Sequence, residues 1–325
     1  MHRPTICIVT PAMSDANNGN WQTAKRWARL LSAHCHVRLS NAWPDGQEAD
    51  LLIALHARRS AASVAAWAHA HPTRPVVVVL TGTDVYRDIH TDATAQATLQ
   101  LAHRLVVLQD QALVELPEAL RGKVQVIYQS CSQRQTLPKT RVHLRVVMVG
   151  HLRDEKWPQV LWQAAQQLSD ADGIYIDHIG KCLEPALGQL ALATAQQCPH
   201  YRWLGERTHA ATRAHIQRAH LLVHTSSLEG GAHVVMEALR SGTPVLASKI
   251  SGNVGMLGAH YNGYFTPGSS EELAQLLRMC RKQLKQANGL CEQLQVQCAS
   301  RAPLFSPAAE AHDLQSLVAL SLQSH

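Results

Sequence analysis

Residues 224–245 read HTSSLEGGAHVVMEALRSGTPV and combine the end of a strand, a glycine loop and the start of a helix. Two carboxylates of this stretch, Glu229 and Glu237, are separated by eight positions. Glu229 falls in the loop, where it can lie beside a sugar, and Glu237 falls on the helix, where it can accept hydrogen bonds from vicinal hydroxyls such as those of ribose. Glu237 stands among apolar residues, so its carboxylate needs partners. The alternative is a surface glutamate beside a plain glycine hinge.

The same alternation of strand and helix runs through the whole chain and predicts a doubly wound, parallel α/β sheet in each half. The predicted strands are 5–10, 37–39, 51–55, 76–80, 105–108 and 124–128, then 144–149, 174–179, 201–204, 221–224 and 245–247. The predicted helices include 22–32, 60–70, 158–168, 185–197 and 233–240. Ligands of such sheets bind where the strand order reverses.

A polar stretch with a proline, residues 129–141, interrupts the alternation and predicts a linker. We therefore expect one domain over 1–138 and a second over 139–305. Beyond Ser269 only helical pattern remains. The last segment, 306–325, is expected to form a helix that could pack back on the first domain.

Composition narrows the class of protein. The chain has 325 residues, 46% of them hydrophobic, enough for two domains with large cores. Its longest strongly apolar run, 75–80, is far shorter than the roughly 20 residues of a membrane helix, and its N-terminus has no signal-peptide layout. A cytoplasmic protein without stable membrane insertion is the expectation.

Charge and cysteine usage exclude further classes. The formal net charge is +6, but aromatic residues, which stack on bases, make up only 5% of the chain, so we expect no nucleic-acid partner. Eight scattered cysteines, none paired at a two-residue spacing, predict neither a zinc site nor a disulfide framework. No metal site is expected.

Two more strand ends carry candidate ligand groups. Asn18, Gly19 and Asn20 precede the first helix, where free backbone N–H groups would attract a phosphate or a sugar oxygen. An ordinary Asn-Gly turn explains them equally well. Residues 149–158, VGHLRDEKWP, open the second domain with a glycine turn and a proline at the predicted helix start.

In this second segment, Gly150 leaves room for a phosphate, and Lys156 and Arg153 supply positive charge at the helix start. Cations there can neutralise the charge of a departing diphosphate. A solvated charged loop is the alternative. The scattered histidines, His151, His224 and His233 included, need no catalytic role.

The spacing of Glu229 and Glu237, followed by the strand after Gly242, resembles the large family of retaining glycosyltransferases with two facing Rossmann-like domains and an interdomain cleft, the GT-B type. The resemblance implies that Glu229 contacts the transferred sugar and Glu237 holds the nucleotide ribose. It implies backbone contacts to the donor from the intervening residues, Gly230, Gly231, Ala232, His233 and Val234. It also assigns Lys156 to the diphosphate. The arginine usual after Gly150 is His151 here, and we expect Arg153 to compensate as the second cation.

A narrower resemblance covers nearly the whole chain. Residues 10–12 (TPA), 17–24 (NNGNWQTA), 54–60 (ALHARRS) and 80–87 (LTGTDVYR) are similar to those of the selenosugar synthases of selenoneine biosynthesis. This resemblance implies transfer of a sugar from UDP-N-acetylglucosamine, or also UDP-glucose, to the selenium of selenophosphate. The UDP-sugar is then a co-substrate, and no cofactor is expected.

Selenophosphate is ionised at neutral pH, so no base has to remove a proton before the transfer. Its binding instead requires cations. His56, Arg58 and Arg59 follow the third predicted strand, and paired arginines suit a phosphate-like anion. The fourth strand is followed by a second group of candidate acceptor contacts, namely Thr81, Gly82, Thr83 and Asp84. The alternatives are a basic helix start on the surface and an aspartate that only caps a turn.

The sequence is also compatible with two other functions. Transfer to a hydroxyl acceptor, such as an oligosaccharide, a lipid carrier or a small alcohol, would need a general base, for which His56 and Asp84 are candidates. A catalytically silent protein would bind a nucleotide sugar and turn nothing over.

Overall fold

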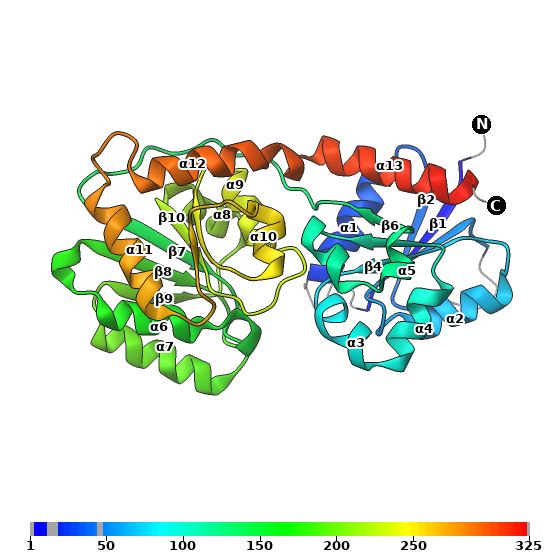
Figure 1. The fold of residues 1–325 in the computed structure, drawn as a ribbon, viewed down its shortest axis with the longest axis horizontal. Coiled ribbons are helices and arrows are strands. Elements are labelled where there is room, and N and C mark those ends of the chain that lie inside the picture. Colours follow the sequence, from blue (N-terminus) through cyan, green and yellow to red (C-terminus); the bar gives the residue numbers. More distant parts are fainter. Residues whose placement is uncertain (1–2, 12–18, 44–47, 324–325) are drawn as a thin grey trace. The chain divides into compact units, whose positions relative to one another are not determined.

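The computed structural model describes residues 3–11, 19–43 and 48–323. The chain divides into two compact units (Figure 1). The N-terminal unit comprises Met1–Ser130 and Leu304–His325, and the C-terminal unit comprises Cys131–Pro303. Each unit contains a parallel sheet of six strands, which confirms the predicted α/β fold.

The sheet of the N-terminal unit has the strand order β2-β1-β3-β4-β5-β6, with every neighbouring pair parallel. Its strands are β1 (Thr5–Val9), β2 (His36–Ser40), β3 (Leu51–Leu55), β4 (Val76–Leu80), β5 (Arg104–Val107) and β6 (Val124–Val126). Its main helices are α1 (Gly19–Leu31), α2 (Ala61–Ala70), α4 (Ala93–Leu101) and α13 (Pro307–Gln323). The short elements are η2 (Asp84–Asp88), α3 (Ile89–Thr91), η3 (Asp110–Glu115) and α5 (Glu118–Arg121). The predicted strands lie within two residues of these bounds.

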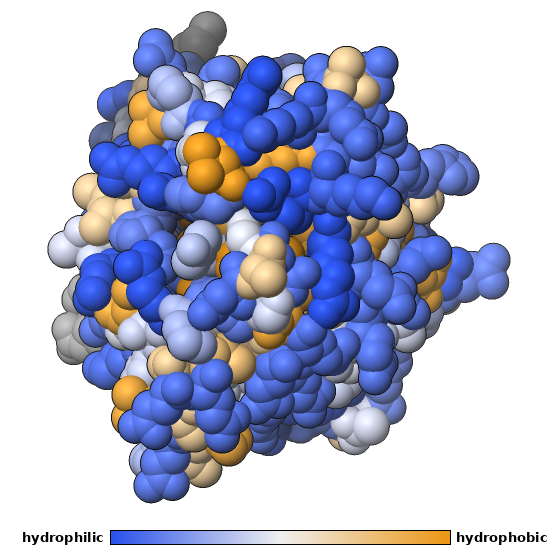
Figure 2. Space-filling view, turned by 90° about the vertical axis from the view of Figure 1, so that its left-hand side faces the viewer, coloured by the Kyte–Doolittle hydropathy of each residue, from blue (hydrophilic) through white to orange (hydrophobic). Residues whose placement is uncertain are grey.

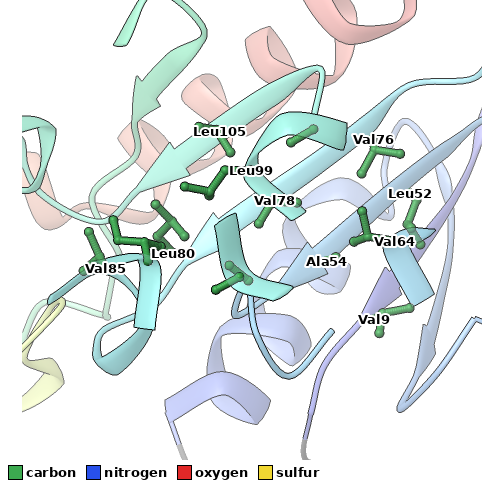
Figure 3. Packing of buried hydrophobic residues seen from close by; sticks show 14 of the residues in the cluster. Val9, Leu52, Ala54, Val64, Val76, Val78, Leu80, Val85, Leu99 and Leu105 are labelled. Carbon is green, nitrogen blue, oxygen red and sulfur yellow. The ribbon is translucent and has the colours of Figure 1, made fainter. Parts of the chain in front are cut away.

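Both faces of this sheet are buried, which explains why β3 and β4 are continuous apolar runs rather than alternating ones. In β4, Val76, Val78 and Leu80 point to one face and pack with residues of α2 and α4 (Figure 3). Val77 and Val79 point to the opposite face, where residues of α1 and α13 cover them.

The last helix, α13, is fixed to the N-terminal unit through Glu310. This carboxylate is fully buried and accepts hydrogen bonds from Arg26 Nε (2.8 Å), Trp27 Nε1 (2.7 Å) and the backbone N–H of Ser130 (2.9 Å). Because a buried charge is costly unless it is paired and hydrogen-bonded, these contacts make α13 an integral part of this unit.

The sheet of the C-terminal unit has the order β12-β11-β10-β7-β8-β9 and is also parallel. Its strands are β7 (Leu144–Val149), β8 (Ile174–Ile179), β9 (Tyr201–Gly205), β10 (Leu221–His224), β11 (Val245–Ser248) and β12 (Tyr264–Phe265). Its helices are α6 (Pro158–Gln167), α7 (Pro185–Gln197), α8 (His209–Arg218), α9 (His233–Leu239), α10 (Ser251–Leu257), α11 (Ser270–Lys282) and α12 (Leu290–Arg301). The strand order reverses between β7 and β10.

The surface is predominantly polar on the face drawn in Figure 2, where hydrophobic side chains form small, separate groups. Among the described residues, no helix combines the length and the apolar character needed to cross a membrane. All eight cysteines carry free thiols.

Candidate active site

The candidate donor loops lie where the strand order of the C-terminal sheet reverses. Gly150 follows β7, and the loop 225–232 follows β10, the strand directly beside it. Carboxyl ends of parallel strands meet at one edge of the sheet, and a reversal of strand order opens a crevice there. The topology therefore brings together two segments that are more than seventy positions apart in the sequence.

Hydrogen bonds hold these two loops against each other. Thr225 Oγ1 donates to the carbonyl oxygen of Lys156 (2.8 Å), and the backbone N–H of Ser227 donates to that of Glu155 (3.0 Å). Glu155 and Lys156 form the short 3-10 turn η4 (Asp154–Lys156), which ends at Trp157 in the left-handed region (φ 46°) before α6 begins. These bonds fix the backbone of Glu155 and Lys156 against the loop after β10.

The centre of the site is an ion pair between the Lys156 ammonium and the Glu229 carboxylate. The same carboxylate oxygen accepts a hydrogen bond from Ser226 Oγ (2.7 Å). Burial by itself would raise the pKa of Glu229, but the Lys156 ammonium and His224 outweigh it and hold this pKa well below its usual range. Glu229 is therefore an ionised, firmly oriented carboxylate at neutral pH.

His224, the last residue of β10, is a member of this cluster that sequence reasoning missed. Its Nε2 lies 3.4 Å from Glu229 Oε1, and its side chain is 2% exposed. Burial lowers its pKa, although Glu229 acts in the opposite direction. Its place directly before the glycine loop was the one signal in the sequence that could have identified it.

Glu237 has cationic partners on a neighbouring helix. On α9, its Oε1 lies 2.6 Å from Nε2 of the exposed His209 and 3.8 Å from the buried guanidinium of Arg213, both on α8. The hydrogen bond that His209 donates to Glu237 raises the pKa of His209, with burial opposing it. The carboxylate thus has the partners that its apolar neighbours in sequence require, and neither cation was predicted.

The other predicted donor residues differ in how closely they approach this cluster. The Lys156 side chain passes over Gly150, where an added Cβ would meet it at 3.5 Å. Arg153 points elsewhere: its side chain is 44% exposed and its Nε lies 3.8 Å from Glu155 Oε2. His151 accepts a hydrogen bond from the backbone N–H of Lys181 through Nδ1 (3.1 Å). The structure brings Lys156, and not Arg153, to Glu229.

The glycine loop is closely packed against α10. A Cβ at Gly252 would lie 2.0 Å from the carbonyl oxygen of Glu229, so this position excludes any side chain. The backbone N–H of Ala232 points at Met256 Sδ (3.1 Å). Gly230 and Gly231 complete the loop, and His233 and Val234 begin α9.

Among the predicted acceptor residues, Asp84 connects two loops of the N-terminal unit. Its fully buried carboxylate accepts hydrogen bonds from the backbone N–H groups of Ala57 (3.0 Å), Thr81 (2.9 Å) and Gly82 (2.8 Å). Ala57 follows β3, and Thr81 follows β4. This geometry favours a positioning role for Asp84 over direct contact with a solute.

His56 lies beside this junction in a left-handed backbone conformation (φ 72°). Its Nε2 is 3.1 Å from Thr83 Oγ1 and 3.9 Å from the Asp88 carboxylate, and its Nδ1 is 3.9 Å from Asp84. Burial lowers the pKa of His56 even though both aspartates act in the opposite direction. The imidazole is therefore neutral at pH 7.

The two candidate anion-binding arginines differ in their surroundings. Arg58 pairs through Nε with Asp92 (2.9 Å) while its side chain remains 54% exposed. Arg59 is exposed, and no carboxylate of the described residues lies within 4.0 Å of its guanidinium. Gly19 and Asn20 form the start of α1, whereas Asn18 lies outside the described residues.

Within residues 3–11, 19–43 and 48–323, no group of three or more His, Cys, Asp or Glu side chains could hold a metal ion.

A family model matches part of the C-terminal half of the chain. Residues 132–290 match the family described as "Glycosyl transferases group 1". No curated protein matches the chain in sequence.

Similar folds occur among solved structures. HepE from Anabaena, in complex with UDP and glucose, superposes with a TM-score of 0.74 at 17% identity, over 98% of this chain and 100% of that one. The complex of HepE with UDP-glucose superposes with a TM-score of 0.72 at 18% identity, over 97% of this chain and 99% of that one. Sucrose-phosphate synthase from Thermosynechococcus elongatus superposes with a TM-score of 0.76 at 15% identity, over 99% of this chain and 100% of that one. At such identities the likeness establishes the fold, which is that of the GT-B glycosyltransferases.

Proposed function

Because the C-terminal unit carries a group 1 glycosyl transferase domain, we propose that the chain transfers N-acetylglucosamine from UDP-N-acetylglucosamine to the selenium of selenophosphate. The observation that carries the glycosyl-transfer part is the Lys156–Glu229 ion pair at the reversal of strand order. The complexes of HepE with UDP and UDP-glucose support a UDP-sugar as the donor class. The selenium acceptor rests on the resemblance to selenosugar synthases.

In this proposal the donor binds the loops after β7 and β10. The ionised Glu229 lies beside the sugar, where a carboxylate stabilises an oxocarbenium-like transition state. Lys156, with Arg153 as a second cation, stabilises the diphosphate as UDP departs with the electron pair of the broken C–O bond. Glu237 accepts hydrogen bonds from the ribose hydroxyls.

The acceptor brings its own nucleophile. A lone pair on the selenium of selenophosphate forms the new C–Se bond, so no proton has to be removed first. Arg58 and Arg59 then bind the phosphate oxygens, for which the forked guanidinium geometry is suited. Hydrolysis of the Se–P bond by water would release phosphate and the free selenosugar.

A second candidate acceptor class is favoured by one observation. The neutral His56, close to Asp84 and Asp88, has the protonation state of a general base. A hydroxyl acceptor would need such a base, whereas selenophosphate would not. Replacement of His56 by Gln should therefore abolish turnover with a hydroxyl acceptor and leave transfer to selenophosphate largely intact.

The deciding experiment is mass spectrometry of the full chain incubated with UDP-N-acetylglucosamine and selenophosphate. A product that contains selenium and a hexosamine, formed with equimolar UDP and absent with the Lys156→Ala variant, is the expected result. UDP release that requires an added alcohol would overturn the selenium acceptor and leave the glycosyltransferase. Tight UDP binding without turnover on any acceptor would identify a silent binding protein.

A further inference from the structure

A cavity of about 470 Å³ lies at the end of the C-terminal sheet where β7 begins. The donor loops lie at the other end, where β7 and β10 finish. Its lining comprises Leu137, Pro138, Lys139, Thr140, Arg145 and Arg218. Arg145 is the second residue of β7, whereas Gly150 follows the last, so about 16 Å of extended strand separates the two ends. The cavity is therefore distinct from the candidate donor site.

The charged groups of this cavity all have the same sign. Lys139, Arg145 and Arg218 are cations, and among the described residues no carboxylate lies within 4.0 Å of any of them. Arg145 donates through Nε to His143 Nε2 (3.0 Å), and its side chain makes no other hydrogen bond within the described part of the chain, so most of its donors remain available. Three cations with no carboxylate beside them favour an anionic ligand.

Lys139 strengthens this inference because it is partly buried. Burial lowers its pKa to about 8, with Cys291 acting in the opposite direction. A desolvated ammonium loses the water that stabilises its charge, and a bound anion would replace that stabilisation.

The cavity wall that carries Lys139 is held in place by hydrogen bonds. Gln217 Nε2 donates to the carbonyl oxygen of Gln135 (2.7 Å), and Thr136 Oγ1 donates to that of Ser241 (3.0 Å). The ring of His220 accepts from the backbone N–H of Arg145 (2.9 Å) at Nδ1 and reaches the carbonyl oxygen of Thr140 (2.7 Å) from Nε2. The backbone of this wall is thus fixed before a ligand binds, which reduces the entropic cost of binding.

We propose that this cavity is a binding site for a phosphate-bearing small molecule. Arg145 and Arg218 hold the phosphate oxygens through their planar guanidinium groups, and Lys139 contributes the third charge. The volume lies in the range of cavities that hold small organic ligands, so a sugar phosphate or a nucleotide would fit. This site is independent of the function proposed for the donor loops.

The test is calorimetric titration of the full chain with inorganic pyrophosphate at constant ionic strength. The Arg145→Gln, Arg218→Gln double variant should weaken binding by about tenfold or more, as expected for the loss of a charged hydrogen bond. The control is Arg207→Gln, which removes an exposed arginine that donates a hydrogen bond to the carbonyl oxygen of Glu206 (3.0 Å) and should bind pyrophosphate like the parent.

A parallel titration of Lys156→Ala separates this cavity from the donor loops. Binding that disappears in Lys156→Ala and persists in the double variant belongs to the donor loops and overturns the proposal, as does equal binding by the double variant and the parent. If the double variant does not fold, the parent protein still provides a test of the site. Pyrophosphate should raise the pKa of Lys139, as measured by NMR. An unchanged pKa at saturating pyrophosphate would contradict the proposed site.

Discussion

The ammonium of Lys156 lies against the carboxylate of Glu229, seventy-three positions further along the chain. Each of these side chains is only slightly exposed, at 16% and 13%. The contact exists because β7 and β10, the strands that precede the two loops, are neighbours in the sheet. The two residues should therefore behave as one unit, in stability as well as in ligand binding.

Removal of Lys156 alone should lower the free energy of unfolding more than removal of both Lys156 and the charge of Glu229. Lys156→Ala leaves the buried Glu229 carboxylate without its cation, which costs about 3 kcal/mol of unfolding free energy. Adding Glu229→Gln to this variant removes the unpaired charge and should restore part of the loss. Urea unfolding of the two single variants and the double variant gives the coupling energy. Lys285→Ala removes an exposed lysine and is the control. If the losses of unfolding free energy in the two single variants add up to the loss in the double variant, the pair is not coupled.

UDP binding should depend on Lys156 and Glu237. If Lys156 holds the diphosphate and Glu237 the ribose, alanine at either position weakens UDP binding by about 1–3 kcal/mol per lost charged hydrogen bond. Calorimetry on variants with parent-like thermal unfolding measures this directly. Glu271→Ala, on the exposed side of α11, should bind UDP like the parent. Unchanged affinity in both folded variants would refute the assigned donor loops.

The His209–Glu237 pair should contribute stability that depends on pH. Because Glu237 raises the pKa of His209 above its ordinary 6.5, the folded chain holds this proton more tightly than the unfolded chain. The contribution is complete below 6.5 and is lost as the pH rises through the raised pKa. The stability difference between the parent and His209→Gln, from urea unfolding over a pH series that brackets 6.5, should shrink with rising pH. A stability difference that grows with rising pH would show that folding lowers the pKa of His209 instead of raising it.

The arginine pair after β3 should affect the acceptor and not the donor. Replacing Arg58 and Arg59 by Ala should raise the KM for selenophosphate by about tenfold or more. UDP affinity measured without acceptor should stay near that of the parent. Lysine at both positions should rescue only part of the loss, because a point charge cannot reproduce a forked contact.

Kinetics at saturating donor with varied selenophosphate decide this prediction. Arg87→Ala, an arginine of η2 whose side chain is 60% exposed, is a control from the same unit. A double-alanine variant that keeps its acceptor dependence but loses UDP binding would assign the pair to the donor.

Turnover should persist in the presence of EDTA. In the proposed mechanism the positive charge beside the departing diphosphate comes from Lys156 and Arg153, so a chelator removes nothing that the reaction uses. Initial rates with EDTA, with and without excess magnesium chloride, provide the measurement. Activity that is lost with EDTA and restored by magnesium would show that a metal ion shares this task.

The strands were predictable because each is a short β-rich run flanked by turn residues. The runs 51–55 and 76–80 are apolar throughout, which is typical of parallel strands buried on both faces. β12 was missed, since two residues, Tyr264 and Phe265, are too few to form a recognisable pattern. Its strand character depends on pairing with β11, which only the folded sheet provides.

The candidate site was predictable as a set of residues but not as a set of contacts. Glu229 and Lys156 stand in recognisable loops, yet their ion pair depends on the strand order, which the sequence pattern leaves open. The partners of Glu237, His209 and Arg213, come from another helix and carry no local signal. His224 was expected to have no catalytic role, like the other scattered histidines, because nothing in the sequence shows that it lies beside Glu229.

The burial of Glu310 has a consequence for how the polypeptide forms during synthesis. Its partners Arg26, Trp27 and Ser130 leave the ribosome early, but the carboxylate that satisfies them arrives only with the last helix. The C-terminal unit is one continuous segment and can complete its sheet first. Domains usually fold in the order of their synthesis. In this chain, the unit that is translated first is the one that must wait for its final piece.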